Sequence, residues 1–208
     1  MFQGVLPEPF DLLLARARAG DERAFEGLYR DLAPRVARYL RVQAPDFAED
    51  AASDAWYEVA RAIGRFEGNE IAFRAWVFTI ARHKVVDHAR REWRTRRVEL
   101  SDQPVQGHGD DAAECADLAE QTRQAVALVR TLPPDQAEVV MLRVVAGLDN
   151  AEIAELLDKS SGAVRVLAHR GLRRLARTLQ AAAPDGRSGA DPESDGGAAS
   201  AVQGGVTR

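Results

Sequence analysis

The chain has 208 residues, 46% hydrophobic and only 6% aromatic, so it can form one large domain or two small ones with cores built mainly from Ala, Leu and Val. Its formal net charge of −4 argues against nucleic-acid binding only if the charges are spread evenly along the chain. Its single cysteine, Cys115, excludes an intramolecular disulfide and a multi-cysteine zinc site.

Helical periodicity runs through the first part of the chain. Asp11 is the candidate N-cap of a short helix that Gly20 ends, and Asp21 is the candidate N-cap of a second helix. Pro34 lies inside the second helix and is expected to kink it or divide it in two. A third helix is expected at residues 47–65.

A turn is expected at residues 66–69, followed by a long fourth helix that starts near Ile71. Its inner face is expected to carry Phe73, Trp76, Val77, Ile80 and Val85. Because Phe73 and Trp76 fall on this apolar stripe, we interpret them as core residues rather than as stacking platforms for bases.

The charges are strongly segregated from the end of this helix onward. Residues 82–97 hold seven basic and two acidic side chains, residues 98–120 hold seven acidic ones and no Lys or Arg, and residues 159–177 hold six basic ones and no acidic ones. Such blocks can present two positive faces on a net-acidic chain, although a solvated helix face is the alternative for either block alone. The Pro, Gly and acidic residues at 98–113 are typical of a flexible linker, and residues 181–208 of a disordered tail.

The sharpest local pattern lies between Leu132 and Leu175. One helix follows Leu132 and ends at Gly147, a short second helix is capped near Asp149, and Ser160 or Ser161 can cap a basic last helix. The last helix is expected to bury Val164, Leu167, Leu172 and Leu175. This arrangement predicts a helix-turn-helix whose second helix enters the DNA major groove, and the alternative is a plain three-helix bundle with a charged outer face.

These residues also carry a family resemblance. The C-terminal string is Leu132-Pro133, Gly147-Leu148, Glu152-Ile153-Ala154, Gly162-Ala163-Val164-Arg165, Arg170 and Leu175. The N-terminal string is Asp50, Ser53-Asp54-Ala55-Trp56, Phe66-Glu67-Gly68, Phe73-Arg74-Ala75-Trp76, Ile80-Ala81-Arg82-His83, Asp87 and Arg90-Arg91. In this order they resemble bacterial RNA polymerase sigma factors, and the absence of an intervening domain resembles the extracytoplasmic-function group.

The resemblance implies an all-α fold of two small helical domains, at residues 9–97 and 114–178, joined by a flexible acidic linker, with the helix-turn-helix in the C-terminal domain. It implies three sets of contacts. Core RNA polymerase would meet Asp50, Ser53, Asp54 and Trp56, unless Trp56 is simply core. The minus-ten promoter element would meet Asn69, Arg82, His83, Lys84, Arg90, Arg91 and Arg94, with His83 standing where the family often has Asn. The minus-thirty-five element would meet Lys159, Ser160, Ser161, Arg165, Val166, His169 and Arg170.

The family's partners are core RNA polymerase, promoter DNA and commonly an anti-sigma factor, and we expect no cofactor, metal or catalytic residue. The main alternative is a stand-alone helix-turn-helix regulator, which polymerase-dependent DNA binding would distinguish. An enzyme is disfavoured because His83 and His88, five positions apart, do not share a helix face as metal ligands do. The acidic segment would either thread a basic polymerase channel or screen the two basic faces.

Two features of the sequence bear on where the protein acts. No apolar run approaches the roughly 20 residues that a membrane span needs. The N-terminus lacks the apolar stretch of a signal peptide. We therefore expect a cytoplasmic protein without direct membrane insertion.

Overall fold

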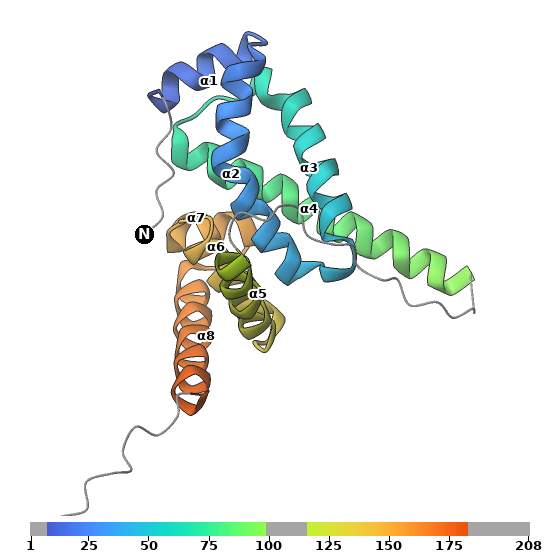
Figure 1. Ribbon diagram of the computed structural model, residues 1–208, viewed down its shortest axis with the longest axis vertical. Coiled ribbons are helices and arrows are strands. Elements are labelled where there is room, and N and C mark those ends of the chain that lie inside the picture. Colours follow the sequence, from blue (N-terminus) through green and yellow to red (C-terminus); the bar gives the residue numbers. More distant parts are fainter. Residues whose placement is uncertain (1–7, 99–115, 183–208) are drawn as a thin grey trace, which may run out of the picture.

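The computed structural model describes residues 8–98 and 116–182, and within these ranges the regular structure is entirely helical (Figure 1). The predicted linker (residues 98–113), Cys115 and the predicted tail (residues 181–208) lie almost entirely outside the described residues. The exceptions are Val98, which ends one helix, and residues 181–182, which end another. Within the described ranges, each helix is too short or too polar to cross a membrane. The predicted all-α class is confirmed.

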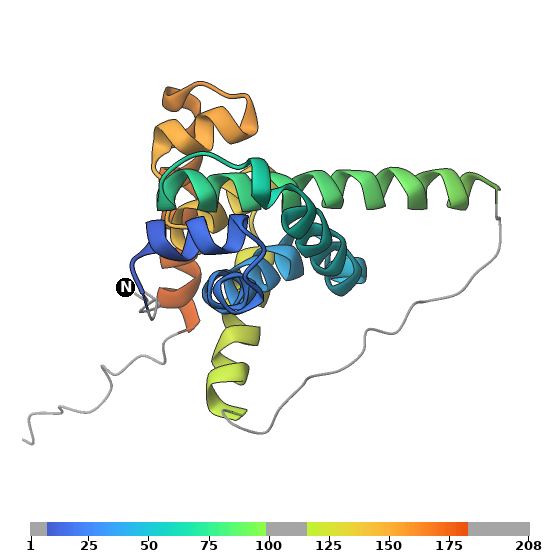
Figure 2. The same ribbon diagram turned by 90° about the horizontal axis from the view of Figure 1, so that it is seen from above.

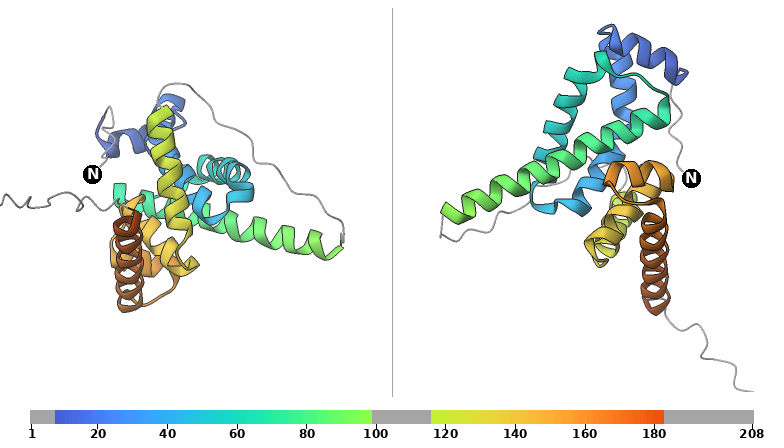
Figure 3. Two further views of the ribbon diagram at one scale, coloured as in Figure 1. Left: turned by 60° about the horizontal axis from the view of Figure 1, so that its bottom comes forward. Right: turned by 180° about the vertical axis from the view of Figure 1, so that it is seen from behind.

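The N-terminal group consists of four helices connected by short turns. They are α1 (Phe10–Arg18), α2 (Glu22–Gln43), α3 (Ala48–Ala62) and α4 (Glu70–Val98), with single 3-10 turns at Pro45–Phe47 and Ile63–Arg65. α3 packs along α4, and α2 packs against α1, α3 and α4. The C-terminal end of α4 projects away from the other helices (Figures 2 and 3).

Local chemistry explains where these helices begin, corrects the expected cap of the first helix and excludes a division of the second. Asp21 caps α2 as predicted, because its Oδ1 accepts hydrogen bonds from the backbone N–H groups of Arg23 and Ala24. Asp11 does not cap α1: the cap position is Pro9, and Asp11 lies in the first turn. Pro34 does not divide α2, which continues through it as a single helix from Glu22 to Gln43.

The C-terminal group contains the predicted helix-turn-helix. Its helices are α5 (Ala116–Arg130), α6 (Pro134–Val144), α7 (Asn150–Leu157) and α8 (Ser161–Ala182). Asp149 and Glu152 form a complete capping box at the start of α7. Asp158, with φ of 52°, ends α7 in the left-handed conformation, and the Ser160 Oγ then accepts the backbone N–H of Ala163 to cap α8. These caps fix the sharp turn between α7 and α8.

The buried stripe of α8 differs from the predicted one. Val164 is buried and Leu167 and Leu175 are half-buried, but Leu172 is 42% exposed. α8 lies very close to α6 at Gly171, where a Cβ atom would lie 2.8 Å from Cγ2 of Val140. The missing side chain therefore allows α8 to approach α6, and Leu172, next along the helix, turns outward.

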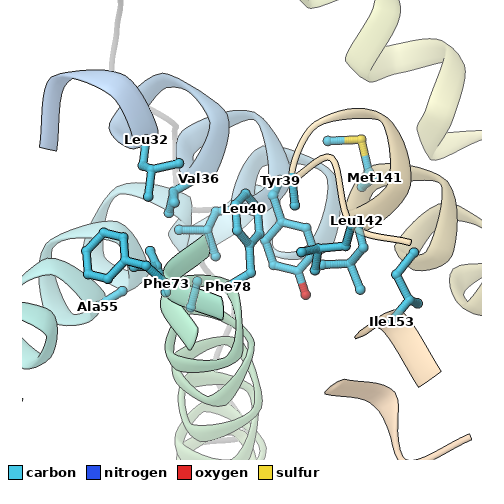
Figure 4. Close-up of a cluster of buried hydrophobic side chains, with 14 of the residues drawn as sticks. Leu32, Val36, Tyr39, Leu40, Ala55, Phe73, Phe78, Met141, Leu142 and Ile153 are labelled. Carbon is cyan, nitrogen blue, oxygen red and sulfur yellow. The ribbon is translucent and has the colours of Figure 1, made fainter. Parts of the chain in front are cut away.

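Both helical groups share one apolar core. Tyr39 of α2 and Phe78 of α4 pack edge-to-face with ring centroids 5.5 Å apart. Leu142 of α6 and Ile153 of α7 belong to the same buried cluster (Figure 4). α2 contacts both α5 and α6, and α4 contacts α7. In this structure the C-terminal group is therefore seated directly on α2 and α4.

Candidate functional site

The second helix of the helix-turn-helix presents a basic face to solvent. Val164 and Ala168 of α8 are buried against the rest of the C-terminal group, so the opposite side of the helix is free of core packing. The exposed side chains on that side include most of the predicted minus-thirty-five residues, namely Arg165, Val166, His169 and Arg170. An exposed basic helix following a tight turn has the geometry that reads base edges in the major groove.

The other three predicted minus-thirty-five residues lie at the turn that precedes α8. Lys159 pairs with Asp135 of α6, with Nζ 3.5 Å from the carboxylate oxygen. Ser160 is exposed but uses its hydroxyl as the α8 cap, and Ser161 is the exposed first residue of the helix. A helix N-terminus with two hydroxyls and a nearby cation is suited to a DNA phosphate.

A basic groove continues along α8 beyond these residues. Its volume is about 340 Å³, and it is lined by Gln136, His169, Arg170, Arg173, Arg174 and Arg177. The last three arginines of this groove are not among the predicted minus-thirty-five residues. The structure brings them beside His169 and Arg170, and their spacing of three and four residues is the signal for a shared side.

The basic residues of α4 do not form one row, as their clustering in the sequence suggested, but point to three sides of the helix. Arg82 faces α6, where its Nε lies 2.9 Å from Oε1 of Glu138. Lys84 and Arg91 face α3, and their nitrogens lie 3.7 Å from Glu58 and 3.9 Å from Asp54. His83, Arg90 and Arg94 are exposed and share the third side, since each residue turns the helix by about 100°.

This third side of α4 also borders an open groove of about 690 Å³. From α4 and its cap, the groove is lined by Asn69, Ile71, Ala72, Ala75, Trp76, Thr79 and His83. Trp76 was interpreted as a core residue, but it is only half-buried, so part of its ring is open to solvent. The ring packs on Phe66 with centroids 4.9 Å apart. Asn69 caps α4 by accepting the N–H of Ala72 at 2.9 Å, which leaves its amide nitrogen as the group available to a base.

The predicted polymerase-binding residues lie on α3, together with one side chain that was not predicted from the sequence. Asp50 and Ser53 are exposed, and Asp54 accepts a contact from His88 Nε2 at 3.0 Å. Tyr57, which is 65% exposed, falls on the same side of α3 and is the unpredicted residue. The signal in the sequence is its helical spacing, since Tyr57 stands four positions after Ser53 and three after Asp54.

Trp56 lies at the edge of this surface rather than in the centre of the core. It is half-buried, and its ring packs edge-on against Tyr29 at 4.7 Å and Phe25 at 6.4 Å. Tyr29 of α2 is itself 41% exposed. The structure therefore extends the predicted α3 site into an aromatic cluster, Phe25, Tyr29 and Trp56, shared by α2 and α3.

Among the described residues, no cluster of three His, Cys, Asp or Glu side chains is placed to hold a metal ion. A separate electrostatic feature lies at Tyr39 of α2. Burial raises the pKa of the Tyr39 phenol well above its ordinary value, and the nearby Glu138 carboxylate raises it further. The phenol therefore stays protonated and donates to Glu138 Oε1 at 3.2 Å.

The chain is similar to known proteins in both halves. The family model for sigma-70 region 2 matches residues 28–95, and the one for sigma-70 region 4 matches residues 118–175. The chain is 36% identical over 171 residues to the ECF RNA polymerase sigma factor BldN of Streptomyces coelicolor, covering 80% of this chain but 64% of that relative. It is 32% identical over 182 residues to SigD of Mycobacterium tuberculosis H37Rv, also an ECF sigma factor, covering 84% and 86%.

Two solved structures share the fold. CnrH, in complex with the cytosolic domain of CnrY, aligns with a TM-score of 0.57 at 22% identity, covering 83% of this chain and 97% of CnrH. The sigma factor RpoE, in complex with the anti-sigma factor NepR from Bartonella quintana, aligns with a TM-score of 0.56 at 21% identity, covering 75% and 96%. Two sigma-70 regions in the predicted order, and identity above 30% over most of SigD, establish that the chain belongs to the ECF family of RNA polymerase sigma factors.

Proposed function

We propose that this ECF sigma factor binds core RNA polymerase and directs it to promoters through two separate DNA-binding faces. The observation that carries the proposal is the exposed basic face of α8, held on a capped helix-turn-helix. In this division of labour α1–α4 (residues 10–98) form the N-terminal domain, which holds the polymerase and the minus-ten element, and α5–α8 (residues 116–182) read the minus-thirty-five element. Neither role requires a chemical step by the chain itself.

For the minus-ten element, the exposed third side of α4 is the favoured surface. His83, Arg90 and Arg94 offer cations or donors to a strand's phosphates, and the groove beside Trp76 offers an aromatic surface and the Asn69 amide to an unpaired base. Each face alone is small and is expected to bind weakly. Because the polymerase holds both at a fixed spacing, tethering raises the effective concentration of the second contact and makes the pair selective.

We further propose that the protein acts in the cytoplasm, where it would meet polymerase and chromosomal DNA, and that an anti-sigma protein antagonises it. The RpoE structure is of a complex with an anti-sigma factor, which supports a protein antagonist for a chain of the same fold. Such a partner would compete for the α3 surface, which is rich in exposed acidic and aromatic side chains.

The proposal is tested by run-off transcription with the purified chain and core RNA polymerase on a pool of upstream sequences from the source genome, at a fixed salt concentration. Discrete transcripts are expected only when both proteins are present. Tight, specific DNA binding by the chain alone, with no new transcripts when core polymerase is added, would instead identify a stand-alone regulator.

Trp56→Ala is expected to weaken binding to core polymerase by about 30-fold, roughly 2 kcal/mol, because tryptophan is among the side chains whose truncation most weakens a protein interface. The affinity is measured by fluorescence titration of labelled chain with core polymerase. Tyr57→Ala separates binding from folding, because this exposed ring can be removed without a cavity, and it is expected to weaken binding by about tenfold.

Leu179→Ala, which truncates another exposed apolar residue, should leave polymerase affinity unchanged. If Trp56→Ala lowers thermal stability while Tyr57→Ala binds polymerase like the unmodified chain, Trp56 is a core residue and the proposed α3 interface is wrong.

Arg165→Ala and Arg173→Ala are expected to weaken holoenzyme binding to the minus-thirty-five element in different ways. Arg165, near the start of α8, is assigned to a base edge, so its loss should cost about 1–3 kcal/mol on the cognate element and reduce discrimination against altered ones. Arg173, in the basic groove, is assigned to phosphate, so its loss should weaken all sequences equally.

The measurement is promoter affinity of the holoenzyme at several salt concentrations on cognate and scrambled elements. Arg173→Ala should lower the salt slope by about one. Equal discrimination by the Arg165→Ala and Arg173→Ala proteins would contradict the assignment of Arg165 to base readout.

A further inference from the structure

We infer that His88 of α4 is a positioning residue for polymerase binding, because it holds the Asp54 carboxylate and the first two turns of α3 in place. The inference rests on the proposed function, in that it takes the exposed side of α3 as the polymerase surface. It goes beyond that function because it gives a side chain of α4, the helix assigned to DNA, a role in holding core polymerase.

His88 lies against α3, largely covered by it. The His88 side chain is 17% exposed, and its Nε2 lies 3.0 Å from Oδ2 of Asp54. Asp54 is one of the predicted polymerase-binding residues, and its side chain is 47% exposed. A mostly covered imidazole therefore meets a carboxylate that is half open to solvent. In this arrangement His88 acts on polymerase through Asp54 rather than by touching it.

The chemistry of the two groups fixes the direction of their hydrogen bond. An ionised carboxylate can only accept, so Nε2 of His88 carries the proton and donates it to Asp54. Nε2 can donate in the neutral ring, where the other nitrogen is an acceptor, and in the charged ring, where both nitrogens donate. The bond therefore forms in either charge state of the ring, and it engages Oδ2 of Asp54 in both.

Phe47 fixes the plane of the imidazole. The rings of Phe47 and His88 are stacked, with centroids 5.2 Å apart and an interplanar angle of 14°. Phe47 is the N-cap residue of α3, and Asp54 stands seven positions later, which is about two helical turns. His88 therefore contacts both the start and the second turn of α3. The exposed residues Asp50 and Ser53 lie between these contacts, so the same contacts position them as well.

Asp54 has a second basic neighbour on α4. Nη1 of Arg91 lies 3.9 Å from the same oxygen, Oδ2, which is beyond hydrogen-bond distance. An arginine can bind a carboxylate through two parallel hydrogen bonds, which would engage both oxygens of Asp54. The bond from His88 keeps Oδ2 engaged, so that Oδ1 remains for a donor of polymerase. Without that bond, we expect Asp54 to turn to Arg91 and be lost to the interface.

A histidine that only packed between α3 and α4 would tolerate different replacements from one that positions Asp54. Phenylalanine keeps a ring that can stack on Phe47, but it has no N–H to donate. Glutamine lacks the ring, but its amide nitrogen can donate to the Asp54 carboxylate. A packing role therefore predicts that phenylalanine is the better replacement at position 88, whereas the positioning role predicts that glutamine is.

The first test is a fluorescence titration of the labelled full chain with core polymerase. His88→Phe is expected to weaken binding by about tenfold, because a hydrogen bond to a charged group is lost, and His88→Gln by less than about threefold. Glu8→Gln is the matched control: it neutralises a partly exposed carboxylate that pairs with Arg16, outside α3, and should leave the affinity unchanged. If His88→Gln binds as weakly as His88→Phe, or more weakly, the inference is overturned.

A double-mutant cycle tests whether His88 acts through Asp54. Asp54→Ala alone is expected to weaken polymerase binding by about tenfold, and adding His88→Phe should weaken it by no more than about a further twofold. Independent effects would instead multiply to about a hundredfold. A loss of that size would overturn the inference, because His88 would then act on polymerase binding by a route that does not include Asp54.

The hydrogen bond itself is tested by proton NMR of the free chain labelled with ¹⁵N-histidine, which does not depend on the stability of a His88 variant. An imidazole N–H that a carboxylate holds exchanges slowly enough with water to give a low-field signal. One such Nε2–H signal is expected from the unmodified chain and from Glu8→Gln, and it should disappear in Asp54→Ala. Its absence from the unmodified chain, or its survival in Asp54→Ala, would overturn the inference.

The two proposals fail differently. If Asp54→Ala, Trp56→Ala and Tyr57→Ala all bind polymerase like the unmodified chain, the α3 interface of the proposed function fails, and the role of His88 fails with it. If Asp54→Ala weakens binding but His88→Phe does not, the α3 interface stands and only the role of His88 fails.

Discussion

Phe78→Ala is expected to lower the free energy of unfolding by about 3–5 kcal/mol, as large-to-small changes of buried aromatic residues do. Phe78 is fully buried and packs edge-to-face on Tyr39, whose hydroxyl reaches Glu138 in the other helical group. The cavity would therefore open at the junction of the two groups. Because domains of this size have free energies of unfolding of only about 5–15 kcal/mol, the expected loss is a large part of the total.

The measurement is urea unfolding followed by circular dichroism at 222 nm. Leu12→Ala is the control, since this apolar side chain is 50% exposed and its truncation should change the free energy of unfolding by no more than about 0.5 kcal/mol. A loss of less than about 1 kcal/mol for Phe78→Ala would mean that Phe78 is not part of a close-packed core.

Gly171→Leu is expected to reduce minus-thirty-five binding by at least about a hundredfold, because misplacing α8 removes two or more base contacts of about 1–3 kcal/mol each. A Cβ atom at Gly171 would lie 2.8 Å from Val140 Cγ2 and 3.5 Å from Gln136 Cβ, so a leucine must push α8 off α6. Overpacking of this kind also lowers the free energy of unfolding by about 1–3 kcal/mol. The readouts are holoenzyme affinity for the element and thermal unfolding of the chain.

Gly162, in the same helix, offers a matched control whose substitution is expected to raise the free energy of unfolding rather than lower it. At Gly162 the nearest atom to an added Cβ is Ser160 Oγ, 4.0 Å away, so Gly162→Ala meets no obstruction. It should raise the free energy of unfolding by about 0.5 kcal/mol through the conformational entropy of the unfolded chain. If Gly162→Ala and Gly171→Leu changed stability alike, the close approach of α8 to α6 would not be what Gly171 provides.

Much of the secondary structure could be predicted from short-range chemistry. Several signals act on neighbours within four positions, so their effects can be recognised in the sequence. They are the capping residues Asp21 and Asp149, the proline that precedes α6 and the turn before Ser160. The helix-turn-helix and its exposed basic side followed from the same information. Of the two outcomes expected at Pro34, division of the helix does not occur, because α2 packs against five other α-helices that hold it in one piece despite the missing donor.

The position of individual side chains around a long helix could not be predicted in the same way. Leu172 was expected in the core because leucine is apolar, but the close approach at Gly171 turns it outward. Tyr57 was missed because its exposure depends on how α3 lies against α2 and α4. The basic residues of α4 were treated as one set because composition does not reveal which side of a helix is covered.

The sequence by itself determined the helical class, the helix-turn-helix, the segregation of charge and the sigma-factor family, because each depends on local spacing or on a string of residues. Only the tertiary structure decided that Arg82 faces Glu138, 56 positions away, that Lys84 and Arg91 face α3, and that His83, Arg90 and Arg94 are left exposed. The physical reason is that a charge acts on whatever lies within a few ångströms of it, and for Arg82 the nearby carboxylate is brought there by packing between α2, α4 and α6.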